Sequence, residues 1–212
     1  MGRIPEAVTQ DWTSIETGRL IKSIGQAHAS WPARVFANQM KFNKRSHHDI
    51  NVAALEALVG SSALIYRGVK QVSRLPFTFH EGFRGSYSTD NEFGSGIYAT
   101  PDIAYALAYS GRLGALMVFD WSDNAPEDVK KELNDDDWAL TVKGCTCFQL
   151  AHVPQLPVHD CDIMYGPVSA NHDAILTCTA PERSNIMQYM APTDNGFAVL
   201  ERRFVGIVYF QM

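Results

Sequence analysis

The sequence predicts an α+β protein in which a split, mostly antiparallel β-sheet lies behind a small helical lobe. The first sixty residues carry apolar side chains at roughly helical spacing, and from Ser62 onward the chain changes to short apolar runs separated by turn residues. A chain of 212 residues is long enough for one domain with a sizeable core and an extension, but short for two full domains. We therefore expect a helical N-terminal extension over residues 1–60 and a main domain over residues 61–212.

The N-terminal extension is expected to contain three helices. Residues 11–16 resemble a capped helix start, Pro32 interrupts the pattern, and residues 33–40 and 50–59 predict two further helices. The basic run at 41–45 between them is interpreted as a solvated loop. We expect the extension to give structural support, and a regulatory or acceptor-recognition role stays open.

The main domain is expected to alternate short strands with few helices. Helices are predicted at 101–111 and 197–202, and a surface helix is predicted within the acidic segment 124–137, starting near Pro126. The predicted strands cover residues 63–68, 95–99, 115–121, 162–165, 185–190 and 205–210. No internal repeat interrupts this order.

Charge and composition narrow the classes of partner. The net charge of −5 argues against a broad nucleic-acid footprint, although a small nucleotide needs only one or two cations. No apolar run is long enough to cross a membrane, and the first residues lack an apolar signal core, so we expect a cytoplasmic or host-delivered protein. The pair Cys145 and Cys147 is too tightly spaced for the usual zinc motif, so the cysteines are expected to be reduced and no metal site is predicted.

The most informative run is residues 93–100, Phe-Gly-Ser-Gly-Ile-Tyr-Ala-Thr, which is followed by a helix-like segment at 102–109. Two glycines precede a short strand that contains Tyr98, and the helix presents Tyr109 eleven residues later. Two aromatic faces of this kind can sandwich a flat ring. The alternative is a glycine-rich turn that leads into a core strand and an amphipathic helix.

This run, beginning Gly94-Ser95-Gly96-Ile97-Tyr98, resembles the core signature of the ADP-ribosyltransferase superfamily, most closely its poly(ADP-ribose) polymerase branch. Arg67-Gly68 ends an earlier strand where this superfamily carries His-Gly or Arg-Gly. Residues 161–171, Cys-Asp-Ile-Met-Tyr-Gly-Pro-Val-Ser-Ala-Asn, resemble a signature of an uncharacterised microbial family of the same clan. The resemblance covers roughly residues 62–210 and implies an ADP-ribosyltransferase-like domain over residues 61–212.

The resemblance implies that NAD is the co-substrate and assigns residues to its parts. Arg67 would bind ribose and phosphate oxygens, the backbone of Gly68 would approach the carboxamide, and Tyr98 and Tyr109 would flank the nicotinamide. The other implied NAD-binding residues lie in the loop ahead of the strand: Ser88, Gly94 and Gly96. The alternatives are a strand-end salt bridge for Arg67 and core packing for the two tyrosines. Ser88, in the Ser-Tyr-Ser-Thr run that starts at residue 86, is the second choice for the nicotinamide strand.

The resemblance also implies a catalytic triad of Arg67, Tyr98 and Gln188. Where active members place a glutamate that holds the ribose hydroxyl, this chain has Gln188, which is neutral, and Glu201 and Glu182 are the nearest acids. We therefore expect a mono-ADP-ribosyltransferase with a macromolecular acceptor, which we expect to be a protein, while a nucleic-acid acceptor stays open. The alternatives are an NAD glycohydrolase and a catalytically inactive module that binds NAD, ADP-ribose or a protein.

Overall fold

The computed structural model describes residues 12–14, 34–38, 52–70, 92–110, 115–122, 130–146, 161–171 and 182–210 of the chain. The chain divides into two compact units, which are described separately below. Unit 1 comprises Met1–Gly82, Pro101–Asn124 and Arg203–Met212, and unit 2 comprises Phe83–Thr100 and Ala125–Arg202. The boundary that the sequence predicts near residue 60 stays a prediction.

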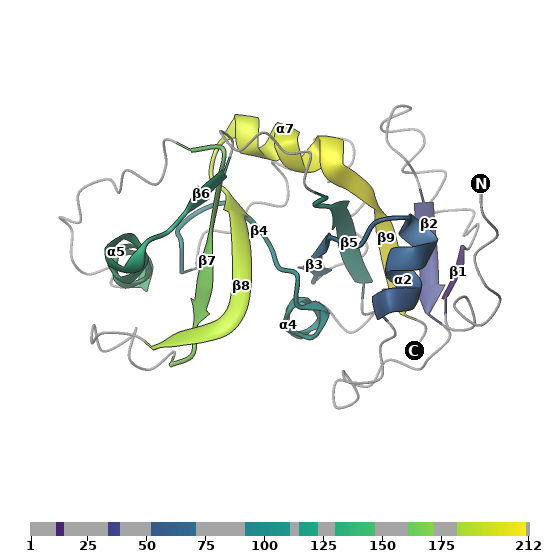
Figure 1. The fold of residues 1–212 in the computed structure, drawn as a ribbon, viewed down its shortest axis with the longest axis horizontal. Helices are drawn as coiled ribbons and strands as arrows, with labels where there is room; N and C mark the ends of the chain where they lie inside the picture. The colour runs from purple at the N-terminus through teal and green to yellow at the C-terminus, as the bar shows by residue number, and fades with distance from the viewer. Residues whose placement is uncertain are drawn as a thin grey trace. The chain divides into compact units, whose positions relative to one another are not determined.

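Unit 1 is built on a five-stranded sheet with the strand order β1-β2-β9-β5-β3 (Figure 1). Its strands are β1 (Trp12–Ser14), β2 (Arg34–Asn38), β3 (Leu64–Val69), β5 (Ala115–Asp120) and β9 (Phe204–Phe210). β5 pairs antiparallel with both β3 and β9, and β2 runs parallel to β9. Residues 115–119 are all buried, so β5 is an almost continuous apolar run, as expected of a strand covered on both faces.

Two helices of unit 1, α2 (Val52–Val59) and α4 (Ile103–Ala108), pack against this sheet. Leu55 of α2 and Leu107 of α4 are fully buried in one cluster with Tyr66 and Val118 from the strands. Asp102 starts α4 because its carboxylate accepts a 2.7 Å hydrogen bond from the Tyr105 backbone N–H. The cap and the buried face together hold α4 beside β3.

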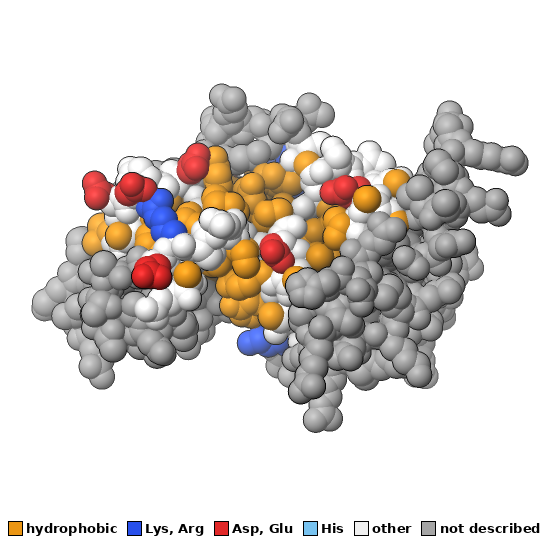
Figure 2. Space-filling view, turned by 60° about the horizontal axis from the view of Figure 1, so that its bottom comes forward, with side chains coloured by type: hydrophobic (Ala, Val, Ile, Leu, Met, Phe, Trp, Pro, Cys, Tyr) orange, Lys and Arg blue, Asp and Glu red, His pale blue; other side chains and the backbone are white. Residues whose placement is uncertain are grey.

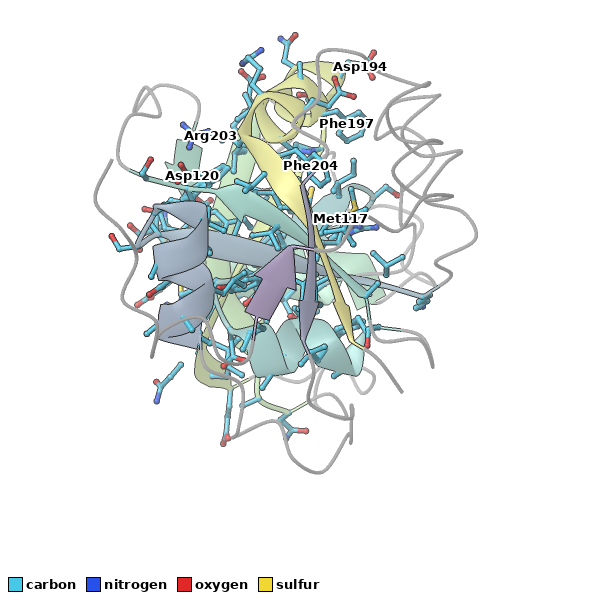
Figure 3. All side chains as sticks on the ribbon, turned by 90° about the vertical axis from the view of Figure 1, so that its right-hand side faces the viewer. Met117, Asp120, Asp194, Phe197, Arg203 and Phe204 are labelled. Carbon is cyan, nitrogen blue, oxygen red and sulfur yellow. The ribbon has the colours of Figure 1, made fainter. Side chains whose placement is uncertain are left out.

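A network of polar contacts lies at the C-terminal end of β5, next to the start of β9. The Arg203 guanidinium donates to the backbone oxygens of Asp120 and Ser122 at 3.1 and 3.5 Å, and it lies 4.6 Å from the ring centroid of Trp121. Figure 3 labels Asp120 and Arg203 at this end of the sheet. Burial acts to raise the pKa of Asp120, but hydrogen bonds from Ser61 and Ser122 and the charge of Arg203 outweigh it, so the pKa is lowered.

Unit 2 is built on a four-stranded sheet with the strand order β4-β8-β7-β6. The strands are β4 (Ile97–Ala99), β6 (Lys130–Glu132), β7 (Ile163–Ser169) and β8 (Arg183–Ala191), and the helices are α5 (Asp135–Thr146) and α7 (Asp194–Arg203), of which Arg203 belongs to unit 1. β8 pairs antiparallel with β4 and β7, and β6 runs parallel to β7. Alternate residues of β7 and β8 are buried, which leaves one face of the sheet packed and the other half-exposed.

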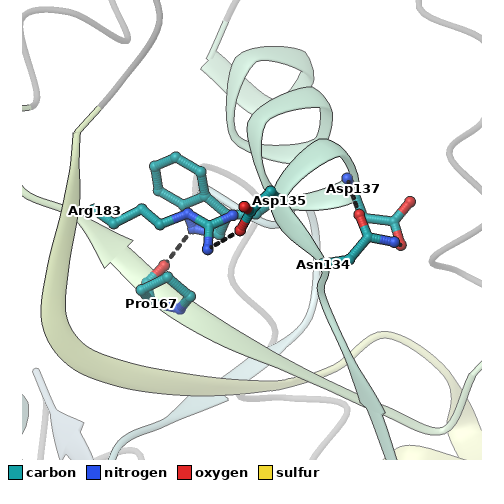
Figure 4. A network of polar contacts seen from close by, with 6 residues as sticks. Asn134, Asp135, Asp137, Pro167 and Arg183 are labelled. Atoms are coloured by element: carbon teal, nitrogen blue, oxygen red, sulfur yellow. Dashed lines mark hydrogen bonds and ion pairs between the residues drawn. The ribbon is translucent and has the colours of Figure 1, made fainter.

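Helix α5 is anchored to this sheet by contacts with Pro167 of β7 and Arg183 of β8, both labelled in Figure 4. The Trp138 indole is 2% exposed, and its Nε1–H donates to the Pro167 backbone oxygen at 2.5 Å. Arg183 lies over the indole at 4.8 Å from the ring centroid and forms a 2.6 Å ion pair with Asp135 in the first turn of α5. Asn134 caps the helix by accepting a hydrogen bond from the Asp137 backbone N–H at 2.9 Å.

The described elements confirm an α+β architecture with mostly antiparallel sheets. Predicted strands at 63–68, 95–99, 115–121, 162–165, 185–190 and 205–210 correspond to β3, β4, β5, β7, β8 and β9. The helices predicted at 101–111 and 197–202 correspond to α4 and α7. Among the helices of the described part of the chain, none is long and apolar enough to cross a membrane.

The described residues depart from the sequence prediction at three places where a helix was expected. Residues 34–38 form β2, because Val35 and Phe36 favour strands and the segment gains parallel partners in β9. Trp12–Ser14, near the expected first helix start, forms β1 against β2. In the acidic segment, residues 130–132 form β6 and α5 begins at Asp135, while the predicted start near Pro126 lies outside the described residues. Of the helical extension predicted over residues 1–60, the described part retains α2.

Candidate functional site

Tyr98 lies in β4 of unit 2, and its hydroxyl holds the turn that precedes the strand. It accepts a hydrogen bond from the Phe93 backbone N–H at 2.9 Å and donates to the Gly94 backbone oxygen at 2.7 Å. The Tyr98 ring is half-buried, with its centroid 6.3 Å from that of Phe93. The aromatic residue that the sequence singles out therefore fastens the Gly94 segment to the sheet.

The structure explains why glycine stands at both positions ahead of Tyr98, Gly94 and Gly96. Gly94 has a φ of 91°, a backbone conformation that side chains disfavour. Gly96 lies so close to β8 that a Cβ atom would overlap the Met190 sulfur and stand 2.5 Å from the Ala191 backbone oxygen. The close approach at Gly96 is thus to the neighbouring strand, as in the alternative reading of a glycine-rich turn into a core strand.

Gln188 lies on the same face of the unit 2 sheet as Tyr98. Tyr98 is directly opposite Met190 in the β4–β8 ladder, and Gln188 precedes Met190 by two residues on β8, so all three side chains share one face. Gln188 is 5% exposed, and its Nε2 donates to the Glu92 carboxylate at 2.9 Å. The structure brings together two predicted residues that are 90 positions apart in the chain.

Glu92 is the member of this face that the sequence analysis missed. Its Oε2 accepts the hydrogen bond from Gln188 and a second one from the Ser169 backbone N–H at 3.0 Å. The residue lies two positions before Gly94, and an acidic side chain next to a glycine-rich turn was the signal that could have identified it. We call Glu92, Tyr98 and Gln188 the carboxyamide cluster.

Arg67, Gly68 and Tyr109 lie in unit 1. A Cβ atom on Gly68 would overlap the Ala106 backbone oxygen and stand 2.8 Å from the Ser110 nitrogen and the Tyr109 carbonyl carbon, so Gly68 faces α4. Because side chains alternate along a strand, Arg67 is directed to the other face of β3, where Met117 is its cross-strand partner. The structure thus brings Gly68 and the Tyr109 backbone together and directs the Arg67 side chain away from that helix.

Tyr109 caps the C-terminal end of α4 and is 47% exposed. Its hydroxyl is 3.0 Å from that of Tyr105, and the two rings meet edge to face with centroids 5.2 Å apart. Tyr105, which the sequence analysis did not select, therefore extends the exposed aromatic surface of this helix. The exposed Tyr109 ring, held in place by its contact with the Tyr105 ring, is suited to stacking on a planar ligand.

The remaining predicted residues are Ser88, Glu201 and Glu182. Ser88 lies outside the described residues. Glu201 is half-buried on α7, and Glu182 is exposed just ahead of β8. The described residues contain no group of three His, Cys, Asp or Glu side chains that could hold a metal ion.

Surface charge agrees with the acidic composition. On the face drawn in Figure 2, the Lys and Arg side chains of the described residues form no continuous basic surface, and several Asp and Glu side chains lie between apolar ones.

Comparison of the chain with protein-family models and with curated proteins found no match.

Proposed function

We propose that this chain is an NAD-dependent mono-ADP-ribosyltransferase that cleaves the nicotinamide–ribose bond and transfers ADP-ribose to a macromolecular acceptor, within an ADP-ribosyltransferase-like fold. The observation that carries the proposal is the carboxyamide cluster. Tyr98 and Gln188, which the motif resemblance selects independently, share one sheet face, and a carboxylate lies 2.9 Å from the Gln188 amide nitrogen. Gln188 is buried and Glu92 is half-buried, so this face carries a hydrogen-bonded polar pair where apolar side chains would be enough for packing.

The proposed roles follow from the charge that develops in the reaction. Loss of nicotinamide leaves an oxocarbenium-like ribose, which is stabilised by acceptor groups aimed at the ribose. The Gln188 amide oxygen would accept the hydrogen bond from a ribose hydroxyl. The motif resemblance assigns Arg67, with its planar fork, to ribose and phosphate oxygens and Tyr109 to the nicotinamide ring, and both of these residues belong to unit 1.

A second candidate function is an NAD-binding or ADP-ribose-binding module without catalysis. Gln188 is neutral where the resembling enzymes carry a glutamate, and the Tyr98 hydroxyl is already bonded to both Phe93 and Gly94. These two facts are what support a site that recognises a ligand without turning it over. NAD glycohydrolysis is the third outcome, in which water replaces the acceptor.

One experiment separates the three outcomes. The full chain is incubated with NAD labelled in the ADP-ribose part, and nicotinamide release and label transfer to lysate proteins are followed together. We expect both signals. Release without transfer indicates a glycohydrolase, binding without either signal indicates a recognition module, and the absence of binding contradicts the proposal.

Variants then assign the roles. Tyr109→Ala should weaken NAD binding by about 1 kcal/mol or more, roughly the contribution of one aromatic stack. Leu140→Ala is the matched control, because Leu140 is 49% exposed and lies on α5, outside the predicted site. Gln188→Ala should reduce turnover more than binding. If Glu201→Ala abolished turnover and Gln188→Ala did not, the placement of the last motif would be wrong.

A further inference from the structure

Glu92 constrains the direction of the Gln188 side-chain amide. A carboxylate accepts hydrogen bonds and donates none when ionised, so the end of the amide that faces Glu92 must be the nitrogen. The Ser169 backbone N–H donates to the same carboxylate oxygen at 3.0 Å, which fixes that oxygen from the neighbouring strand β7. The amide oxygen of Gln188 is consequently the end that this contact leaves for another donor.

The position of the amide is also fixed along the sheet. Gln188 is opposite Gly166 on β7, and a Cβ atom at Gly166 would stand only 3.3 Å from the Phe93 ring, so the side chains there fit closely. Gln188 itself is 5% exposed. A buried amide with one end bound to a charge has a strong preference for a single orientation, because the reverse orientation would bring its oxygen against the carboxylate.

We infer that Glu92 is a positioning residue that orients the Gln188 amide so that its oxygen accepts the hydrogen bond from a ribose hydroxyl of NAD. This inference rests on the proposed function. The Glu92 charge strengthens the N–H end of the amide dipole as a donor and increases the negative partial charge on the oxygen, since hydrogen bonds in series polarise one another. The pair supplies, through a neutral side chain, part of the negative potential that a glutamate would supply directly.

The first test compares Glu92→Leu with Glu92→Gln in the full chain. Leucine removes the acceptor, and we expect the kcat of nicotinamide release to fall by on the order of tenfold to a hundredfold, with KM for NAD nearly unchanged, since misdirected groups cost rate at this scale. Glutamine keeps an oxygen that can accept from both Gln188 and Ser169, so we expect it to recover most of the loss. The ¹⁵N signals of the Gln188 side-chain amide should shift in Glu92→Leu and move little in Glu92→Gln.

An exchange variant tests the same pair if the leucine variant does not fold. Gln188→Glu places two carboxylates side by side, and we expect it to be less active than the wild type, while Glu92→Gln added to it restores an amide beside a carboxylate and raises kcat at least tenfold. A single Gln188→Glu variant that is as active as the double variant would overturn the inferred pairing.

The outcomes separate this inference from the proposed function. If the wild type releases nicotinamide and Gln188→Ala is impaired, while folded Glu92→Leu keeps full kcat, the role of Glu92 is wrong and the proposed function stands. A wild type that neither binds NAD nor releases nicotinamide overturns the proposed function, and the role of Glu92 with it. A wild type that binds NAD without turnover overturns the role of Glu92 in turnover and supports the recognition module.

Discussion

Gly68 is expected to be among the positions in unit 1 least tolerant of a side chain. In a Gly68→Ala variant the new Cβ atom would stand 2.8 Å from the Ser110 nitrogen and from the Tyr109 carbonyl carbon, and would overlap the Ala106 backbone oxygen. All three atoms belong to the backbone, so relief requires α4 to move away from β3. Overpacking of this kind costs typically 1–3 kcal/mol, and we expect about 3 kcal/mol here because no flexible side chain can give way.

The assay is thermal and urea unfolding of the full chain. In a protein of this size, about 3 kcal/mol corresponds to a decrease in Tm of roughly 6–12 °C. Gly60→Ala is the matched control, because a Cβ atom there meets nothing within 4 Å and the strain at its φ of 85° costs only about 1 kcal/mol. If Gly68→Ala destabilised the protein no more than Gly60→Ala, the close packing of β3 on α4 would be refuted.

Three further changes test other parts of the structure by urea unfolding. Tyr66→Phe should leave stability unchanged or raise it by up to about 1 kcal/mol, because the buried Tyr66 hydroxyl has no hydrogen-bond partner among the described residues; a clear loss would show that the hydroxyl is bonded. Trp138→Phe should cost about 1–3 kcal/mol, since it leaves the Pro167 oxygen without its indole donor, and an unchanged midpoint would contradict this contact. The pKa of Asp120 is lowered in the folded state, so its ionised form stabilises the fold at pH values above the ordinary carboxyl pKa, near 4, and this stabilisation is lost as the pH falls through the folded-state pKa. Below about pH 4, the free energy of unfolding should therefore fall less steeply with pH in Asp120→Asn than in the wild type. Parallel curves of unfolding free energy against pH would contradict the assignment.

Strands with a strong local pattern were predictable from the sequence. β5 is a continuous apolar run, and β3 combines β-branched and aromatic residues between turn signals, so both are evident within a residue or two. α4 is evident because Pro101 and Asp102 mark its start and apolar residues follow at helical spacing. In each case the information lies within a few neighbouring residues.

Strands that depend on distant partners were not predictable in this way. β2 lies in a segment that was compatible with a helix, and its strand conformation comes from parallel pairing with β9, about 170 residues later. β6 consists of Lys-Lys-Glu at the edge of its sheet, where charged residues are common and hide the usual strand pattern. Both segments favour a helix when local residue preference alone is considered.

The same division holds for the candidate site. Residue types and their order select Tyr98 and Gln188 as candidates, because a motif is recognised from the side chains and their spacing alone. Only the folded chain brings Glu92 to Gln188 across 96 positions of sequence and shows that Gly96 is required by contact with β8. Hydrogen bonds between strands are formed by register, and register is decided by the packing of whole elements, which no short stretch of sequence contains.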